Sequence, residues 1–350
     1  MTTSGGTGRL VWVDAARGTA VSLVVLMHFV FWISLPSASA DAPVQAWRFF
    51  TGVLAPFRMS LLFALAGVLT SRYVVAGWSA KVRTRVTDGV YLYVVWTFIY
   101  VAFSLLPLAG LGMPFRGQSA WREFVAPTTP LWFILGLALW TAVLALVGGR
   151  VPAWILLPAL ALVSLAVGWL WPDDVPPRIL YYGFFFALGV YGTSWLTTFG
   201  GRPKPLLTAC CAVTVVVAQL ARMAWPAVEP VTDLVAATAG ILVALAGVSI
   251  ACRWRPFATA MSWVGRRTLT VYVLHVPIVV LLGALVAATG VGHTVILTWF
   301  GPVLGMVGIV WLCAALHDPI SRSSLSFLLR PPRVLRPERR PTRDDSPAPS

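Results

Sequence analysis

Ten long apolar stretches constrain the fold of this chain more than any other feature. A helix needs about 20 mostly apolar residues to cross the hydrocarbon core of a bilayer. The stretches lie at about 20–35, 49–70, 89–108, 131–147, 153–171, 180–199, 206–225, 234–252, 268–289 and 294–316. Only 11% of the 350 residues are charged, against about 25% in soluble domains. We therefore predict an all-α integral membrane protein, a bundle of about ten transmembrane helices in a lipid bilayer.

The basic residues lie in short groups between these stretches, and they predict the orientation of the bundle. If the N-terminus is inside and the spans alternate, 20 of the 26 Lys and Arg residues fall inside and five outside, with Arg58 within a span. Cytoplasmic loops of membrane proteins carry such an excess. We expect a multi-pass protein of the cell (plasma) membrane with both termini in the cytoplasm. A nucleic-acid binder would gather its cations on one patch, so the net charge of +14 does not indicate nucleic acid.

The chain divides into a transmembrane domain, residues 1–317, and a tail, residues 318–350. The tail is rich in Arg, Pro and Ser and has little to bury, so it is predicted to be a disordered basic cytoplasmic segment, either solvated or lying on anionic head groups. The four cysteines lie in apolar runs without metal-ligand spacing. We therefore expect neither a disulfide framework nor a metal site.

Two ionisable residues share one face of the first predicted helix. Arg17 and His28 are eleven residues apart, which leaves an offset of about 20° after three turns and a rise of about 16 Å. Asp14 lies close to the same face and three residues before Arg17, close enough to pair with it. One interpretation is a binding face for a long anionic cytoplasmic ligand whose reactive end reaches His28. The other is an inside anchor at Arg17 and a packed, hydrogen-bonded histidine.

Arg58 and His275 are the other ionisable residues expected at membrane depth, where such groups are costly and mark candidate functional sites. Arg58 either faces a ligand chamber, with an anion, backbone carbonyls or water as its partner, or extends to the outer interface. Tyr272 lies one turn before His275 and on the same side, so the two form either part of a site or a structural pair. Trp132 is expected to anchor the protein at the membrane interface, where tryptophan is enriched.

Six segments, in order, resemble motifs of the membrane-bound acyltransferase-3 family. The first is Asp14 and Arg17 followed by His28, since the family has Arg, ten residues, then His. The others are residues 57–67 (FRMSLLFALAG), the basic pair Arg83 and Arg85, residues 131–133 (LWF), residues 184–189 (FFFALG) and residues 268–275 (TLTVYVLH). Within residues 57–67, Ser60, Leu62 and Ala66 depart from the family pattern, but Gly67 still permits close helix packing.

The resemblance implies that acyl groups, often acetyl, pass from cytoplasmic acyl-CoA to a hydroxyl of a sugar, glycan or glycolipid acceptor. Under this hypothesis Arg17, Arg83 and Arg85 hold the coenzyme phosphates, and His28 is the general base. Arg58 orients the acceptor or stabilises the oxyanion. Asp14, Trp132, Tyr272 and His275 are further candidates for shaping the site. Acyl-CoA is thus a co-substrate, and no metal is expected.

Direct transfer and transfer through an acyl-histidine both fit the sequence, and the oligomeric state is left open. The alternative function is a transporter or flippase for an anionic or sugar-bearing lipid, with Arg58 and His28 along its path. Transporters more often show internal repeats and paired broken helices. A non-catalytic scaffold would not explain ionisable groups within the membrane.

Overall fold

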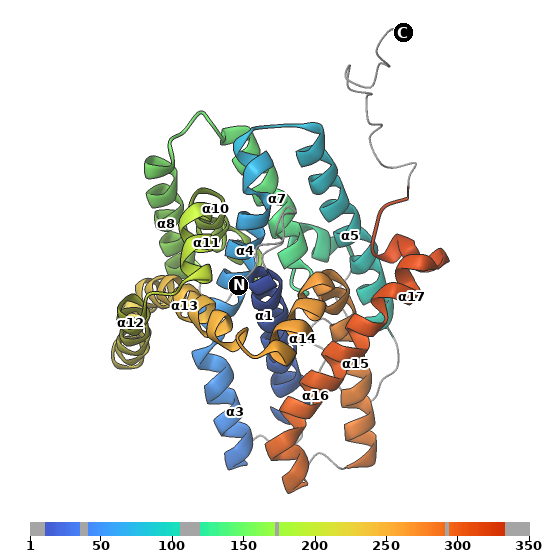
Figure 1. Ribbon diagram of the computed structural model, residues 1–350. Coiled ribbons are helices and arrows are strands. Elements are labelled where there is room, and N and C mark those ends of the chain that lie inside the picture. Colours follow the sequence, from blue (N-terminus) through green and yellow to red (C-terminus); the bar gives the residue numbers. More distant parts are fainter. Residues whose placement is uncertain (1–10, 36–40, 106–119, 172–174, 291–293, 333–350) are drawn as a thin grey trace, which may run out of the picture.

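The protein is a bundle of helices (Figure 1), described here from a computed structural model. The structure describes residues 11–35, 41–105, 120–171, 175–290 and 294–332. These residues contain no strand. The helices in the first half of the chain are α1 (Val11–Phe29), α3 (Ala42–Val53), α4 (Ala55–Val75), α5 (Ala80–Ser104), α6 (Ala120–Val125), α7 (Trp132–Val147) and α8 (Ala153–Leu170). The second half has α9 (Val175–Tyr181), α10 (Gly183–Tyr191), α11 (Thr193–Gly201), α12 (Pro205–Ala224), α13 (Glu229–Ala251), α14 (Arg255–Arg266), α15 (Thr268–Thr289), α16 (Val295–Ala315) and α17 (His317–Arg322).

The predicted transmembrane bundle is confirmed. Within the described residues, eight helices are long and apolar enough to cross a membrane. The remaining two predicted spans correspond to α7, a shorter apolar helix of 16 residues, and to a broken span. In the broken span, residues 177–191 and α11 differ in direction by 76°. The sequence had predicted one continuous helix there.

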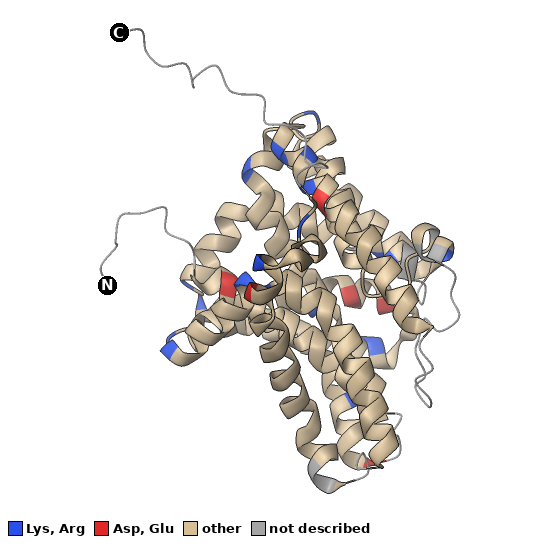
Figure 2. Cartoon of the chain, turned by 90° about the vertical axis from the view of Figure 1, so that its right-hand side faces the viewer, with Lys and Arg blue, Asp and Glu red and all other residues tan. Residues whose placement is uncertain are grey.

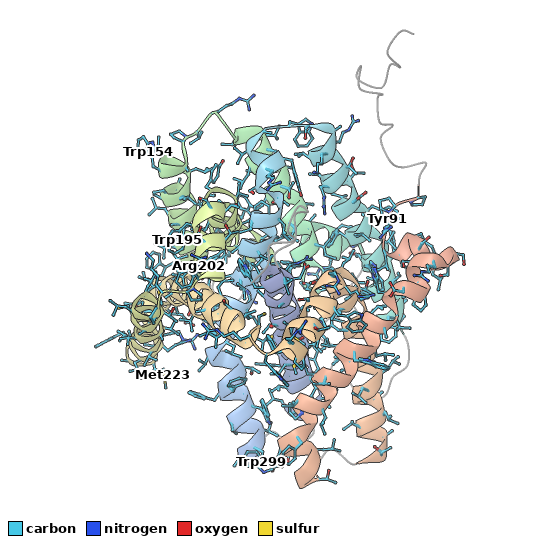
Figure 3. The ribbon with its side chains drawn as sticks, viewed as in Figure 1. Tyr91, Trp154, Trp195, Arg202, Met223 and Trp299 are labelled. Carbon is cyan, nitrogen blue, oxygen red and sulfur yellow. The ribbon has the colours of Figure 1, made fainter. Side chains whose placement is uncertain are left out.

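The outer surface of the bundle is apolar, as a bilayer requires. Of α12, only Cys211 and Ala218 are buried, and its exposed side chains are largely aliphatic. Figure 3 shows Trp154, Trp195, Met223 and Trp299 pointing away from the bundle. Most of the ribbon in Figure 2 carries neither charge, and the charged residues lie mainly toward helix ends and connections. Exposed apolar area of this extent is compatible with lipid rather than water.

Two glycine pairs bring helix backbones into direct contact. A Cβ at Gly67 of α4 would collide with backbone atoms of Phe186 and Val190, and one at Gly189 of α10 would collide with Ala64. Gly67 and Gly189 belong to two separate motifs of the sequence, so packing explains why both motifs contain glycine. A Cβ at Gly18 of α1 would likewise meet the backbone of α14, and Gly265 of α14 lies as close to α1.

The structure adds order that the sequence analysis did not predict. The stretch from Arg255 to Arg266, expected to be an inside loop, forms the amphipathic helix α14. Residues 318–332, assigned to the disordered tail, are ordered: Asp318 pairs with Arg267 at 2.7 Å, and the carbonyl of Leu328 accepts a hydrogen bond of 2.8 Å from the indole of Trp96. These contacts bind the segment to α5 and to the start of α15. Residues 333–350 lie outside the described part.

Candidate active site

The centre of the site is a pair of buried histidines from opposite ends of the chain. His28 lies on the last full turn of α1, and His275 lies on α15. Nε2 of His275 is 3.1 Å from Nδ1 of His28. His275 is fully buried and His28 is 8% exposed. The sequence placed both residues in spans but did not pair them.

The contacts of His275 determine which nitrogen of His28 is free to act as a base. Nδ1 of His275 lies 2.7 Å from the carbonyl oxygen of Tyr272 and 3.1 Å from that of Val271. Carbonyl oxygens only accept hydrogen bonds, so this nitrogen carries the hydrogen. In neutral His275, Nε2 is then an acceptor, and Nδ1–H of His28 must be the donor. His28 is thereby left with its lone pair on Nε2.

A short π-helix, Val30–Ser34, begins two residues after His28. Such segments are rare and frequently occur at functional sites. Trp32 lies within it, and its ring centroid is 4.5 Å from that of His28. The local change in helix geometry therefore positions an indole against the imidazole.

His28 borders a cavity of about 690 Å³, within the range of about 300–1,000 Å³ usual for small-molecule sites. Its lining comes from α1, α4, α7, α13, α15 and the segments around α8, α9 and α12. The polar and aromatic side chains lining it are His28, Phe31, Trp32, Arg58, Thr128, Trp132, Trp169, Trp171, Arg178, Tyr181, Tyr182, Arg222, Glu229, Asp233 and Tyr272. The cavity therefore contains the predicted residues His28, Arg58, Trp132 and Tyr272.

Arg58 is buried in the wall of this cavity, with 7% of its surface exposed. One terminal nitrogen donates to the carbonyl of Thr51 at 3.0 Å, and the other contacts the sulfur of Met27 at 2.8 Å. Its Nε has no hydrogen-bond partner among the described residues. The sulfur is a weak acceptor, so the guanidinium retains donor capacity beside His28. An arginine held in this way suits an anion or an oxygen that develops negative charge.

Stacked aromatic rings form another wall of the cavity. Trp132 lies parallel to Tyr182, with ring centroids 5.3 Å apart, and Tyr182 stacks on Phe63 at 5.0 Å. Phe133 contacts Tyr272, whose hydroxyl donates to the carbonyl of Pro130. Trp132 is only 9% exposed, so it lines the cavity instead of anchoring the protein in the membrane interface.

The predicted coenzyme-binding arginines lie away from the cavity lining. Arg17 pairs with Asp14 at 3.8 Å, as its spacing predicted, and 27% of its side chain is exposed. Arg83 and Arg85 are exposed near the start of α5, where Arg85 lies 6.0 Å from the ring centroid of Tyr73. In Figure 1 the start of α5 lies well apart from the start of α1. The structure therefore does not bring the three arginines together.

Several cavity residues were missed by the sequence analysis. Trp32 is one turn after His28, and Tyr182 lies two residues before the FFFALG stretch, so both residues lie close to sequence motifs that were recognised. Asp233 lies close to the start of α13, where acidic residues are common, so it carried no signal in the sequence. Among the described residues, no three His, Cys, Asp or Glu side chains are grouped to hold a metal ion.

Comparison with known proteins gives one match. A family model described as an acyltransferase domain, acyltransferase 3, matches residues 10–318. No curated protein and no solved structure shows significant similarity to the chain. The matched region extends from the start of α1 to the start of α17 and includes the whole cavity.

Proposed function

Because the chain belongs to the acyltransferase-3 family, we propose that it transfers an acyl group, with acetyl as the expected group, from acyl-CoA to a hydroxyl of a sugar, glycan or glycolipid. The observation that carries this proposal is the His28–His275 pair, which presents the unprotonated Nε2 of His28 beside a cavity. A neutral imidazole is the usual base for activating a hydroxyl near neutral pH.

The proposed reaction uses groups that the cavity provides. The acceptor oxygen attacks the thioester carbonyl while Nε2 of His28 takes the hydroxyl proton. The C–S bond then breaks, and the proton passes to the departing thiolate, which gives an ester and free coenzyme A. As His28 becomes cationic, its Nδ1–H still donates to His275, which holds the ring in position. Arg58 stabilises the negative charge that develops on the carbonyl oxygen.

The orientation predicted from the loop charges places the two substrates on opposite sides. Arg17 then lies near the cytoplasmic start of α1, and His28 is about 26 Å along the helix from Val11. The cavity lining comes from helix ends predicted to be outside, including the end of α8 and the connection from α12 to α13. We therefore propose that the acceptor enters from outside. Arg17, Arg83 and Arg85 are offered as separate candidates for binding the coenzyme phosphates.

The transporter hypothesis has less support than the enzyme. Its best evidence is the 76° bend between residues 177–191 and α11. Transporters commonly place broken helices at corresponding positions of two repeats, whereas the described residues contain one such bent pair. A transporter also has no need for the histidine pair to leave a lone pair on His28.

The test is turnover of radiolabelled acetyl-CoA by the purified full chain in lipid nanodiscs. We expect His28→Ala to abolish turnover while the protein remains monodisperse and helical. The matched control is His317→Ala, since His317 lies on α17 and contacts Thr270, outside the cavity lining. That variant retains activity if the loss is specific. Full turnover by His28→Ala would refute the general base, and absence of turnover by the unmodified protein would count against the enzyme.

A further inference from the structure

The outer part of the cavity carries a cluster of charged side chains that the proposed chemistry does not use. Arg222 lies at the end of α12, and Glu229 and Asp233 lie on the first turns of α13. One terminal nitrogen of Arg222 is 3.4 Å from Glu229 and 3.6 Å from Asp233. All three residues line the same cavity as His28. The cluster is thus positioned to contact a molecule whose reacting end lies at His28.

Asp233 has unused hydrogen-bonding capacity in this cluster. Its Oδ1 is enclosed, yet it has no hydrogen-bond donor among the described residues, because Arg222 at 3.6 Å is beyond hydrogen-bonding distance. An ionised carboxylate accepts hydrogen bonds only. The Asp233 side chain as a whole is 29% exposed, so its carboxylate remains open to a ligand hydroxyl, which can donate a hydrogen bond to it.

An indole lines the same cavity as this carboxylate. Trp169 is on the last turn of α8, and its Nε1 donates at 3.2 Å to the carbonyl of Ala227 in the connection between α12 and α13. Gly168 packs against Pro230, so α8 approaches the start of α13 closely. The indole remains 53% exposed, which leaves part of it open to a ligand. Aromatic faces attract the partly positive C–H groups of a sugar ring.

The charges indicate which acceptors the site would select. Arg178 and Arg222 are balanced in the lining by Glu229 and Asp233, so the entrance has no excess positive charge to attract an anion. A carboxylate or phosphate on the acceptor gains no net attraction there, and it is repelled wherever it lies against Glu229 or Asp233, which favours an uncharged acceptor. An uncharged ring with several hydroxyl groups suits this lining. Its hydroxyl groups can donate hydrogen bonds to the carboxylates and accept them from an arginine, while the ring lies against the indole.

We propose that the outer part of the cavity is the acceptor subsite, that it takes an uncharged sugar ring, and that Asp233 accepts hydrogen bonds from the ring hydroxyls while Trp169 covers one face. This inference rests on the proposed acyltransferase function and adds the class of acceptor. Arg222 holds the carboxylates of Glu229 and Asp233 in position through its ion pairs with them. One hydroxyl of the ring points inward to Nε2 of His28.

The test compares neutral methyl hexosides with the corresponding methyl hexuronides as acceptors for radiolabelled acetyl-CoA, using the full chain in nanodiscs. We expect the neutral sugars to be preferred. Asp233→Asn raises the KM for the neutral sugar about tenfold, with a smaller change in kcat, because a charge-assisted hydrogen bond is lost. It also reduces the preference for neutral over anionic sugars about tenfold. A merely structural role for Asp233 would not change that preference.

Matched controls are available for both residues. Asp41→Asn changes an exposed aspartate at the start of α3 and should leave the KM within twofold. Trp169→Ala should raise the KM, whereas Trp154→Ala, at the opposite end of the same helix and 76% exposed, should not.

Three results would overturn the acceptor subsite. The first is equal use of uronides and neutral sugars, and the second is no use of any neutral sugar. The third is an unaltered KM and preference in Asp233→Asn. In each case, acetyl-CoA turnover that depends on His28 would still support the acyltransferase.

Discussion

The contact between His28 and His275 makes a quantitative prediction about catalysis. Replacing His275 by Leu keeps an apolar side chain of moderate size in this fully buried position but removes the acceptor 3.1 Å from Nδ1 of His28. The hydrogen on Nδ1 then loses that partner, and the protonated form of His28 loses the group that holds it in place. Leaving a buried donor unsatisfied costs about 1–3 kcal/mol, which corresponds to a decrease in kcat of about 5- to 150-fold.

The assay is acetyl-CoA turnover in nanodiscs, with kcat and KM measured separately. We expect kcat to fall in His275→Leu while the KM for acetyl-CoA stays within about twofold, because His275 does not line the cavity. His275→Gln can offer an amide oxygen to His28 and should recover part of the lost kcat. The reasoning is wrong if His275→Leu keeps kcat within twofold. It is also wrong if the Gln variant is no better than Leu although both variants remain folded.

Two further predictions concern the arginines. Arg58→Gln removes the buried cation beside His28 and should lower kcat by about 10²- to 10³-fold, with Arg58→Lys intermediate because a lysine lacks the planar fork; similar kcat values in all three proteins would exclude oxyanion stabilisation. Arg17→Ala should raise the KM for acetyl-CoA about tenfold with little change in kcat, because a charged hydrogen bond to phosphate is lost. Arg83→Ala and Arg85→Ala are measured in parallel, and the variant without an effect on KM identifies an arginine that only anchors the chain.

Much of the fold could be predicted from the sequence because spanning a bilayer needs long apolar segments. The ten stretches correspond to eight long helices, the short α7 and the broken span of α9, α10 and α11. The break was not predicted because residues 180–199 contain no charged residue, and hydropathy indicates how long such a segment is but not whether its helix bends. The helix α14 was missed because it is short and has basic residues at both of its ends, Arg255 and Arg266, a pattern that indicates a connection as readily as an interfacial helix.

The candidate site was predicted in part. His28, Arg58 and His275 stand out because ionisable groups in lipid are costly. Their arrangement could not be predicted, since the contact between His28 and His275 joins residues 247 positions apart and depends on which helices pack together. Asp233 was overlooked because it lies near a helix end, where a charge needs no explanation. Its significance comes from α8 and α12, which enclose it.

The two glycine contacts also determine where inactivating changes will be found. Gly18 and His28 are ten residues apart on α1, and Arg58 and Gly67 are nine apart on α4, so each contact lies about 14–15 Å from its functional side chain. A side chain at Gly18 or Gly67 would push its helix away from α14 or α10 and shift the imidazole or the guanidinium with it. Inherited or selected loss-of-function variants should therefore gather at these glycines as well as at the residues of the cavity.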